Sequence, residues 1–253
     1  MTFTRESSIV FRRQIRMNLR NPVWVLIGVF QPVLYLLLFG PLLTPLVSQF
    51  PGGADNAYTF LVPGLLVQLG LFGAMFAGFS LIGEWREGVI EAERVTPARR
   101  TSLLMGRLMR DVLQLFVQAV ILVVLGFVMG MRGSFTGIVV GIAITLIVGG
   151  ACAASSNALA LTTKDENVMA PVINMVLMPV LLLSGILLPM TLGPTWLQNL
   201  SSIMPFRWVV DAVRASFAGD IVTSTVFWGL LTAVILGALA TWWGTSVFRK
   251  ENA

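Results

Sequence analysis

The sequence predicts an all-α polytopic membrane protein with six transmembrane helices. Hydrophobic residues make up 56% of the 253 residues and charged residues only 11%, and the mean hydropathy of +0.85 lies far above that of water-soluble domains. A helix needs roughly 20 apolar residues to cross the hydrocarbon layer of a bilayer. Six apolar stretches of this kind are separated by short connections, so we expect residues 1–253 to form a single transmembrane domain.

The first segment alternates basic and apolar side chains. Residues 1–21 place Ile9 and Ile15 among five arginines, as an amphipathic helix with a cationic face would. We expect this helix to lie flat on the cytoplasmic surface of the membrane.

Prolines, glycines and charged clusters mark the ends of the apolar stretches. Between the second and third stretches we expect a charged cytoplasmic loop at 84–101. Residues 189–221 are only half apolar, so we expect them to form a short re-entrant helix pair on the outer side. The six spans are expected at residues 22–43, 58–83, 106–131, 135–162, 168–188 and 222–248. The fourth is rich in Gly, Ala and Ser, which let helices approach closely.

The basic residues predict the orientation. With a cytoplasmic N-terminus, only Arg132, Arg207 and Arg214 of the 17 lysines and arginines fall in outer segments. This bias fits the excess of positive charge that cytoplasmic loops carry. We therefore expect a multi-pass protein of the cell membrane, a bacterial inner membrane, with both termini in the cytoplasm.

Several functional classes are disfavoured by what the chain lacks. It has no histidine and a single cysteine, Cys152, so we expect no metal site and no catalytic residue. The basic residues lie beside apolar segments rather than in a basic domain, which argues against a nucleic-acid partner. The apolar parts of the spans hold no charged residue, which argues against a proton- or sodium-coupled carrier.

Polar and aromatic side chains within the spans have two interpretations. They either bond to and pack against neighbouring helices and lipid, or they contact a transported compound. The candidates for a substrate pathway are Gln68, Phe72, Phe76, Gln114, Gln118, Asn157, Asn174 and Met178.

The stretch from Glu84 to Arg100 is the one long charged stretch of the chain. It alternates charges of both signs with apolar residues such as Trp85 and Val95. It is either a solvated linker or a helix that docks into a groove of a partner.

Three motifs resemble one family of transporters. The first is the run Glu84–Pro97, which ends in Thr-Pro, and the second is Leu183-Ser-Gly-Ile-Leu-Leu-Pro189. The third combines Trp196-Leu-Gln, Met204-Pro-Phe and Val210-Asp-Ala-Val-Arg214. In order and spacing they resemble the membrane subunits of type-2 ATP-binding-cassette (ABC) exporters, in the branch of daunorubicin-resistance permeases. The first motif departs from the family pattern, because Val89 and Ile90 stand where Thr and Leu are more common.

The resemblance implies a permease that pairs with a second copy or a homologous permease and is driven by two ATP-binding subunits. The two lysines, Lys164 and Lys250, have no phosphate-binding loop around them, so we expect ATP and Mg²⁺ to bind the partner chain and none to bind this one. By resemblance, residues 1–21 form the connecting helix and 84–101 contain the coupling helix. The coupling residues implied are Glu84, Arg86, Glu87, Glu91, Glu93 and Arg94, with Asp165 and Glu166 as a second contact.

On the outer side, Asp211 and Arg214 are three positions apart and so share a helix face. They form either an ion pair or part of a gate.

The leading hypothesis is a permease subunit that exports a hydrophobic or amphiphilic compound, such as a drug or antibiotic, with membrane lipid around it. A second hypothesis keeps the architecture and makes the cargo a lipid-linked glycan or a lipid. A third, of a different class, is a membrane scaffold or sensor without transport.

Overall fold

The computed structural model describes residues 3–20, 23–45, 56–90 and 100–250. All regular elements in these ranges are helical, and six helical segments are long and apolar enough to cross a membrane. These segments are Val25–Leu43, Ala57–Arg86, Ser102–Val128, Phe135–Thr163, Glu166–Leu183 and Ser224–Val247. The prediction of an all-α polytopic membrane protein is confirmed.

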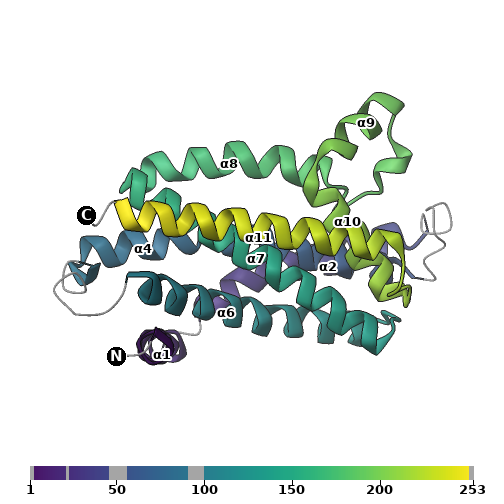
Figure 1. The fold of residues 1–253 in the computed structure, drawn as a ribbon. Helices are drawn as coiled ribbons and strands as arrows, with labels where there is room; N and C mark the ends of the chain where they lie inside the picture. The colour runs from purple at the N-terminus through teal and green to yellow at the C-terminus, as the bar shows by residue number, and fades with distance from the viewer. Residues whose placement is uncertain (1–2, 21–22, 46–55, 91–99, 251–253) are drawn as a thin grey trace.

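The spanning helices lie side by side, and the first helix crosses them (Figure 1). Helix α1 and the C-terminal end of α11 lie at the same end of the bundle, which we call the terminal end; α9 lies at the other, the far end. In chain order the helices are α1 (Phe3–Arg20), α2 (Val23–Leu43), α3 (Ala57–Met75), α4 (Ala77–Arg86), α6 (Arg100–Val128), α7 (Phe135–Thr163), α8 (Glu166–Leu183), η2 (Met190–Leu192), α9 (Thr195–Ile203), α10 (Pro205–Ala218) and α11 (Ser224–Lys250).

Helices α3 and α7 form the buried centre of the bundle. About two-thirds of the apolar window in each is buried, against a fifth to a third in the other spans. The small residues of α7 explain its position: a Cβ added at Gly149 would lie 3.6 Å from the Cα of Gly70 in α3 and 2.1 Å from Leu115. Small residues at this crossing let the two helices approach closely.

The second span is broken, although the sequence predicts one continuous helix over 58–83. Helix α3 ends at Met75 and α4 begins at Ala77. Ser156 of α7 satisfies both backbone groups at the break, because its hydroxyl donates to the carbonyl of Met75 and accepts from the Gly78 N–H. Unpaired backbone groups are costly in a membrane, so this one hydroxyl makes the break possible.

The charged segment after the second span is shorter than expected. Helix α4 continues through Arg86, and α6 begins at Arg100, six residues before the predicted start of the third span at 106. Of the predicted loop 84–101, the structure therefore describes the end of α4, the residues up to Ile90 and the start of α6.

The segment 189–221 contains three helices, η2, α9 and α10, at the far end. Pro205 occupies the first turn of α10, and Gly219 ends it in the left-handed region with φ +100°. Val209, Val213 and Phe217 are fully buried as α10 packs on α3, α7 and α11.

The contact between α7 and α10 leads to a prediction. A Cβ at Gly137 would lie 1.7 Å from the backbone oxygen of Ser216, whereas one at Gly150 of the same helix would lie 3.4 Å from the nearest atom, in Val112. We expect Gly137→Ala to destabilise the protein by about 1–3 kcal/mol through overpacking. Gly150→Ala, the matched control, should be neutral or stabilising by up to about 1 kcal/mol. Thermal unfolding in detergent measures both, and equal midpoints for the two variants would contradict this packing.

Candidate functional site

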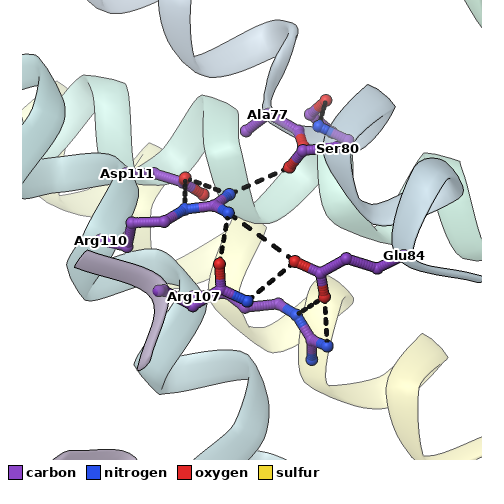
Figure 2. Close-up of polar contacts among 9 residues, drawn as sticks. Ala77, Ser80, Glu84, Arg107, Arg110 and Asp111 are labelled. Carbon is purple, nitrogen blue, oxygen red and sulfur yellow. Dashed lines mark hydrogen bonds and ion pairs between the residues drawn. The ribbon is translucent and has the colours of Figure 1, made fainter. Parts of the chain in front are cut away.

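A network of buried charges joins three helices near the terminal end. Glu84 of α4 accepts hydrogen bonds from Arg107 of α6, with its Oε2 atom 3.1 Å from Nε and 2.7 Å from Nη2. The Arg107 side chain is 2% exposed and that of Glu84 11%. The network therefore lies inside the bundle (Figure 2).

Arg110 occupies the centre of this network (Figure 2). Its Nη2 lies 2.7 Å from Asp111 Oδ1 and donates to Ser80 Oγ at 3.0 Å, while its Nη1 lies 3.8 Å from Glu84 Oε1. Gln14 of α1 closes the ring, because it donates to Glu84 Oε1 at 2.8 Å and accepts from Arg110 Nη1 at 2.9 Å. Two carboxylates and two guanidinium groups thus neutralise one another.

A second buried contact fastens the first helix. Ser102 Oγ of α6 donates to Glu6 Oε2 at 2.7 Å, and both side chains are buried. Because a charge inside a membrane protein needs a partner, these contacts hold α1 on α6 beside α4.

A cavity of about 550 Å³ lies beside the network, between α1, α4 and α6; we call it the inner cavity. Its polar wall includes Glu84, Arg110 and Asp111. Its apolar wall includes Phe76 and Phe79, whose rings stack with centroids 5.5 Å apart. A cavity of this volume with one polar and one apolar wall suits a drug-sized ligand with one polar end.

The inner cavity brings together residues from two predicted sets. Of the pathway candidates, Phe76, Gln114 and Gln118 line it, and Gln118 also donates to the Val25 carbonyl of α2 at 3.1 Å. Of the coupling candidates, Glu84, Glu87 and Glu166 line it. Glutamate 84 is thus an internal residue of the network, whereas the sequence places it in a surface loop.

The remaining coupling candidates lie at the terminal end or outside the described residues. Arg86 pairs with Glu166 at 3.1 Å, and both side chains are largely exposed. Asp165 caps α8 by accepting from the Asn167 N–H at 2.9 Å. Three candidates, Glu91, Glu93 and Arg94, lie outside the described residues.

Five pathway candidates do not line the inner cavity. Gln68 is 1% exposed in α3, with no hydrogen-bond partner for its amide in the described part of the chain, and Phe72 packs against the core. Asn157 is buried in α7, and its amide nitrogen has no hydrogen-bond partner among the described residues. Asn174 and Met178 are exposed on α8.

The outer pair is arranged differently from the predicted ion pair. Asp211 Oδ2 lies 3.6 Å from Arg207 Nε, one helical turn earlier. Arg214 instead donates to the carbonyls of Gly185 and Ile186 at 2.8 and 2.9 Å and lies 4.0 Å from the centre of the Phe60 ring. Burial raises the pKa of Asp211 despite the nearby Arg214 and Arg207. Burial also lowers the pKa of Arg214 to about 10, although Asp211 opposes this.

Sequence reasoning missed Gln14, Ser80, Arg107, Arg110 and Asp111 as members of one site. A signal was present: the basic residues Arg107 and Arg110 and the acidic Asp111 follow one another at helical spacing directly before an apolar run. Such a group on a spanning helix is expected to face the bundle interior.

Comparison with known proteins identifies the family. The pattern that defines the ABC-2 type transporter family matches residues 5–218, and the chain belongs to this family. It is a multi-pass membrane permease of the ABC transporter class, whose members work with ATP-binding subunits.

Relatives at low identity bear transport names. The chain is 26% identical to the daunorubicin resistance ABC transporter permease protein DrrB1 of Streptomyces coeruleorubidus, over 92% of this chain and 82% of that protein. It is 26% identical to ycf38 of Cyanophora paradoxa, named as a transport permease, over 84% of this chain and 74% of the relative. It is 24% identical to YbhR of Escherichia coli K12, named as a multidrug ABC transporter permease, over 76% of this chain and 52% of YbhR.

Arg107 and Arg86 each pair with a glutamate, but only the Arg107 pair is buried, so the two arginines should contribute differently to stability. Arg107→Gln removes the nearest cation of the buried Glu84 and leaves only Arg110, at 3.8 Å, so we expect a loss of about 3–5 kcal/mol in unfolding free energy. Arg86→Gln removes only an exposed pair and should cost less than about 1 kcal/mol. Denaturant unfolding of the purified protein in detergent measures both. The double variant Glu84→Gln with Arg107→Gln should lose less than the sum of the single losses; full additivity would contradict a direct pair.

Proposed function

We propose that this permease exports an amphiphilic compound, of the kind represented by drugs and antibiotics, and that the inner cavity binds this compound first. The inner cavity is the observation on which the proposal rests. It combines a volume of about 550 Å³ with two stacked phenylalanines, three glutamines and a charged wall.

The position of the inner cavity supports this role. The cavity lies where α1 crosses the spanning helices at the terminal end, and Met17 of α1 and Phe76 are both exposed there. A compound dissolved in the adjacent membrane leaflet reaches such a cavity without first crossing the bilayer. Its apolar part meets the phenylalanines, and its polar part meets Gln114 and the charged network.

The network also suggests how ATP-driven movement reaches the inner cavity. We propose that two ATP-binding subunits, which bind ATP and Mg²⁺, dock on the cytoplasmic segment after α4. The permease functions with a second copy or a homologous permease. Movement of that segment would be transmitted through α4, because Glu84 lies on the last turn of this helix and lines the cavity. This arrangement requires the terminal end to face the cytoplasm and the protein to lie in the cell membrane.

The distribution of basic residues supports this orientation. Arg132, Arg207 and Arg214 lie at the far end, whereas the arginines of α1 and the Arg107–Arg110 pair lie toward the terminal end. The excess of positive charge toward one end matches a cytoplasmic terminal end.

Transport in proteoliposomes tests the cavity. We expect the permease, reconstituted with its ATP-binding subunit, to accumulate the fluorescent probe daunorubicin when ATP is supplied. Phe76→Ala should raise the half-saturating probe concentration about three- to tenfold, because an aromatic wall of the cavity is lost. Phe135→Ala is the matched control, since this phenylalanine is 81% exposed at the start of α7 and does not line the cavity. An equal effect of both variants would overturn the assignment of the inner cavity, and no ATP-dependent transport of this or other amphiphiles would overturn export.

A second experiment tests the proposed docking segment. Glu91→Lys together with Glu93→Lys should separate ATP hydrolysis from transport and leave membrane insertion intact, because the acidic contact with the partner is reversed. The charge-conserving variant Glu91→Asp with Glu93→Asp is the control. Hydrolysis and probe accumulation are measured on the same proteoliposomes. Unchanged accumulation in the lysine variant would contradict the coupling role.

A further inference from the structure

A second cavity, of about 640 Å³, lies at the far end of the bundle; we call it the outer cavity. It is formed by α3, the turn after α8, helix α10 and the turn that joins α6 to α7. It shares no lining residue with the inner cavity. Its charged lining residues are Arg132, Arg207, Asp211, Arg214 and Asp220.

These charges are not fully paired with one another. The 3.6 Å contact between Arg207 and Asp211 accounts for one cation and one anion. Arg132 is exposed, and its guanidinium makes no ion pair with any acid among the described residues. Arg214 donates only to neutral carbonyls, and its buried Nε atom has no hydrogen-bond partner in the part of the chain that the structure describes. Against these two cations stands only the carboxylate of Asp220, so the outer cavity carries a net positive charge.

The walls between the charges are apolar. Phe60, Met190 and Phe217 line the outer cavity, and the Phe60 ring packs under the Arg214 guanidinium. The volume is within the range of pockets for drug-sized ligands and far exceeds what a small inorganic anion requires. A guanidinium binds phosphate or carboxylate oxygens in a planar, paired geometry, and does so more strongly in a site that excludes water.

We propose that the outer cavity binds an amphiphile through an oxyanion, a phosphate or a carboxylate, held by Arg132 and Arg214. The apolar body of the ligand lies against Phe60 and Met190. Asp211 opposes the ligand, because its carboxylate neutralises part of the positive charge. The ligand is either the headgroup of a membrane lipid at the far end or a separate anionic amphiphile. Binding at this site requires no ATP and is therefore independent of the export proposed above.

The experiment uses the full chain, purified in a neutral maltoside detergent, and calorimetric titration with dihexanoyl phosphatidic acid. Dihexanoylglycerol, which lacks only the phosphate, is the ligand control. We expect saturable binding of the phosphatidic acid alone, weakened about tenfold or more by Arg132→Gln because a charge-assisted hydrogen bond is lost. Arg12→Gln is the matched protein control: Arg12 is exposed on α1, at the other end of the bundle, and its loss should leave the affinity unchanged.

A third variant distinguishes a binding role from a folding defect. Asp211→Asn should tighten binding severalfold, because it removes a negative charge from the cavity wall and releases Arg207. A misfolded protein would not bind more tightly. Equal affinity of the wild type and Arg132→Gln, or weaker binding by Asp211→Asn, would overturn the proposal.

Two further binding measurements identify the source of the oxyanion. Inorganic phosphate alone should bind far more weakly than the phosphatidic acid; equal affinities would overturn the amphiphilic part of the proposal. In nanodiscs, phosphatidylglycerol should compete with the phosphatidic acid for the wild type if a lipid headgroup fills the site. If phosphatidylcholine and phosphatidylglycerol nanodiscs give the same affinity, the ligand is a separate anionic amphiphile. Either nanodisc result supports the site, provided that Arg132→Gln weakens binding in both.

Discussion

The buried contact between Glu84 and the two arginines of α6 determines how the terminal end of the bundle is built. A carboxylate that is almost fully buried inside the bundle of a membrane protein is stable only when cations and hydrogen-bond donors surround it. Arg107, Arg110 and Gln14 supply them, and they come from α6 and α1. The position of α1 across the bundle and the position of α4 beside α6 therefore depend on the same few atoms.

The break at Phe76 makes α4 a separate short helix. In a continuous helix over residues 58–83, the residues after Met75 would follow the axis of α3, whereas α4 is held at both of its ends by other helices. Ser156 holds its beginning against α7, and Glu84 holds its last turn against α6. The wall made by Phe76, Phe79 and Ser80 lies between these two points and borders the inner cavity. The cavity thus results from the same contacts that stabilise the charges.

Most of the fold could be predicted because the bilayer imposes a simple rule. The thickness of the hydrocarbon layer sets the length of each apolar stretch, and the bias of arginines toward one end separates the two ends of the bundle. The site was harder to predict. Arg107, Arg110 and Asp111 lie at the start of the predicted third span, and nothing in their spacing indicates that Glu84 of α4 and Gln14 of α1 bind the two arginines inside the bundle. The partner of Asp211 could not be chosen from spacing alone, because Arg207 and Arg214 are both within one turn of it.

The two cavities lie at opposite ends of the bundle and share no lining residue. Gly70 and Gly149 bring α3 and α7 into backbone contact, and the neighbouring small residues of α7 are buried. A compound that moves from one end to the other therefore requires helices to shift rather than a fixed passage through this core. Helix α4 is a separate unit of the chain, because the break at Phe76 and the turn at Gly88, with φ +74°, bound it, but a shift of α4 requires its contacts with Ser156 and Arg107 to be exchanged. Its movement would alter the wall of the inner cavity and the charged network in one step, and it would leave the outer cavity, which α4 does not line, unchanged.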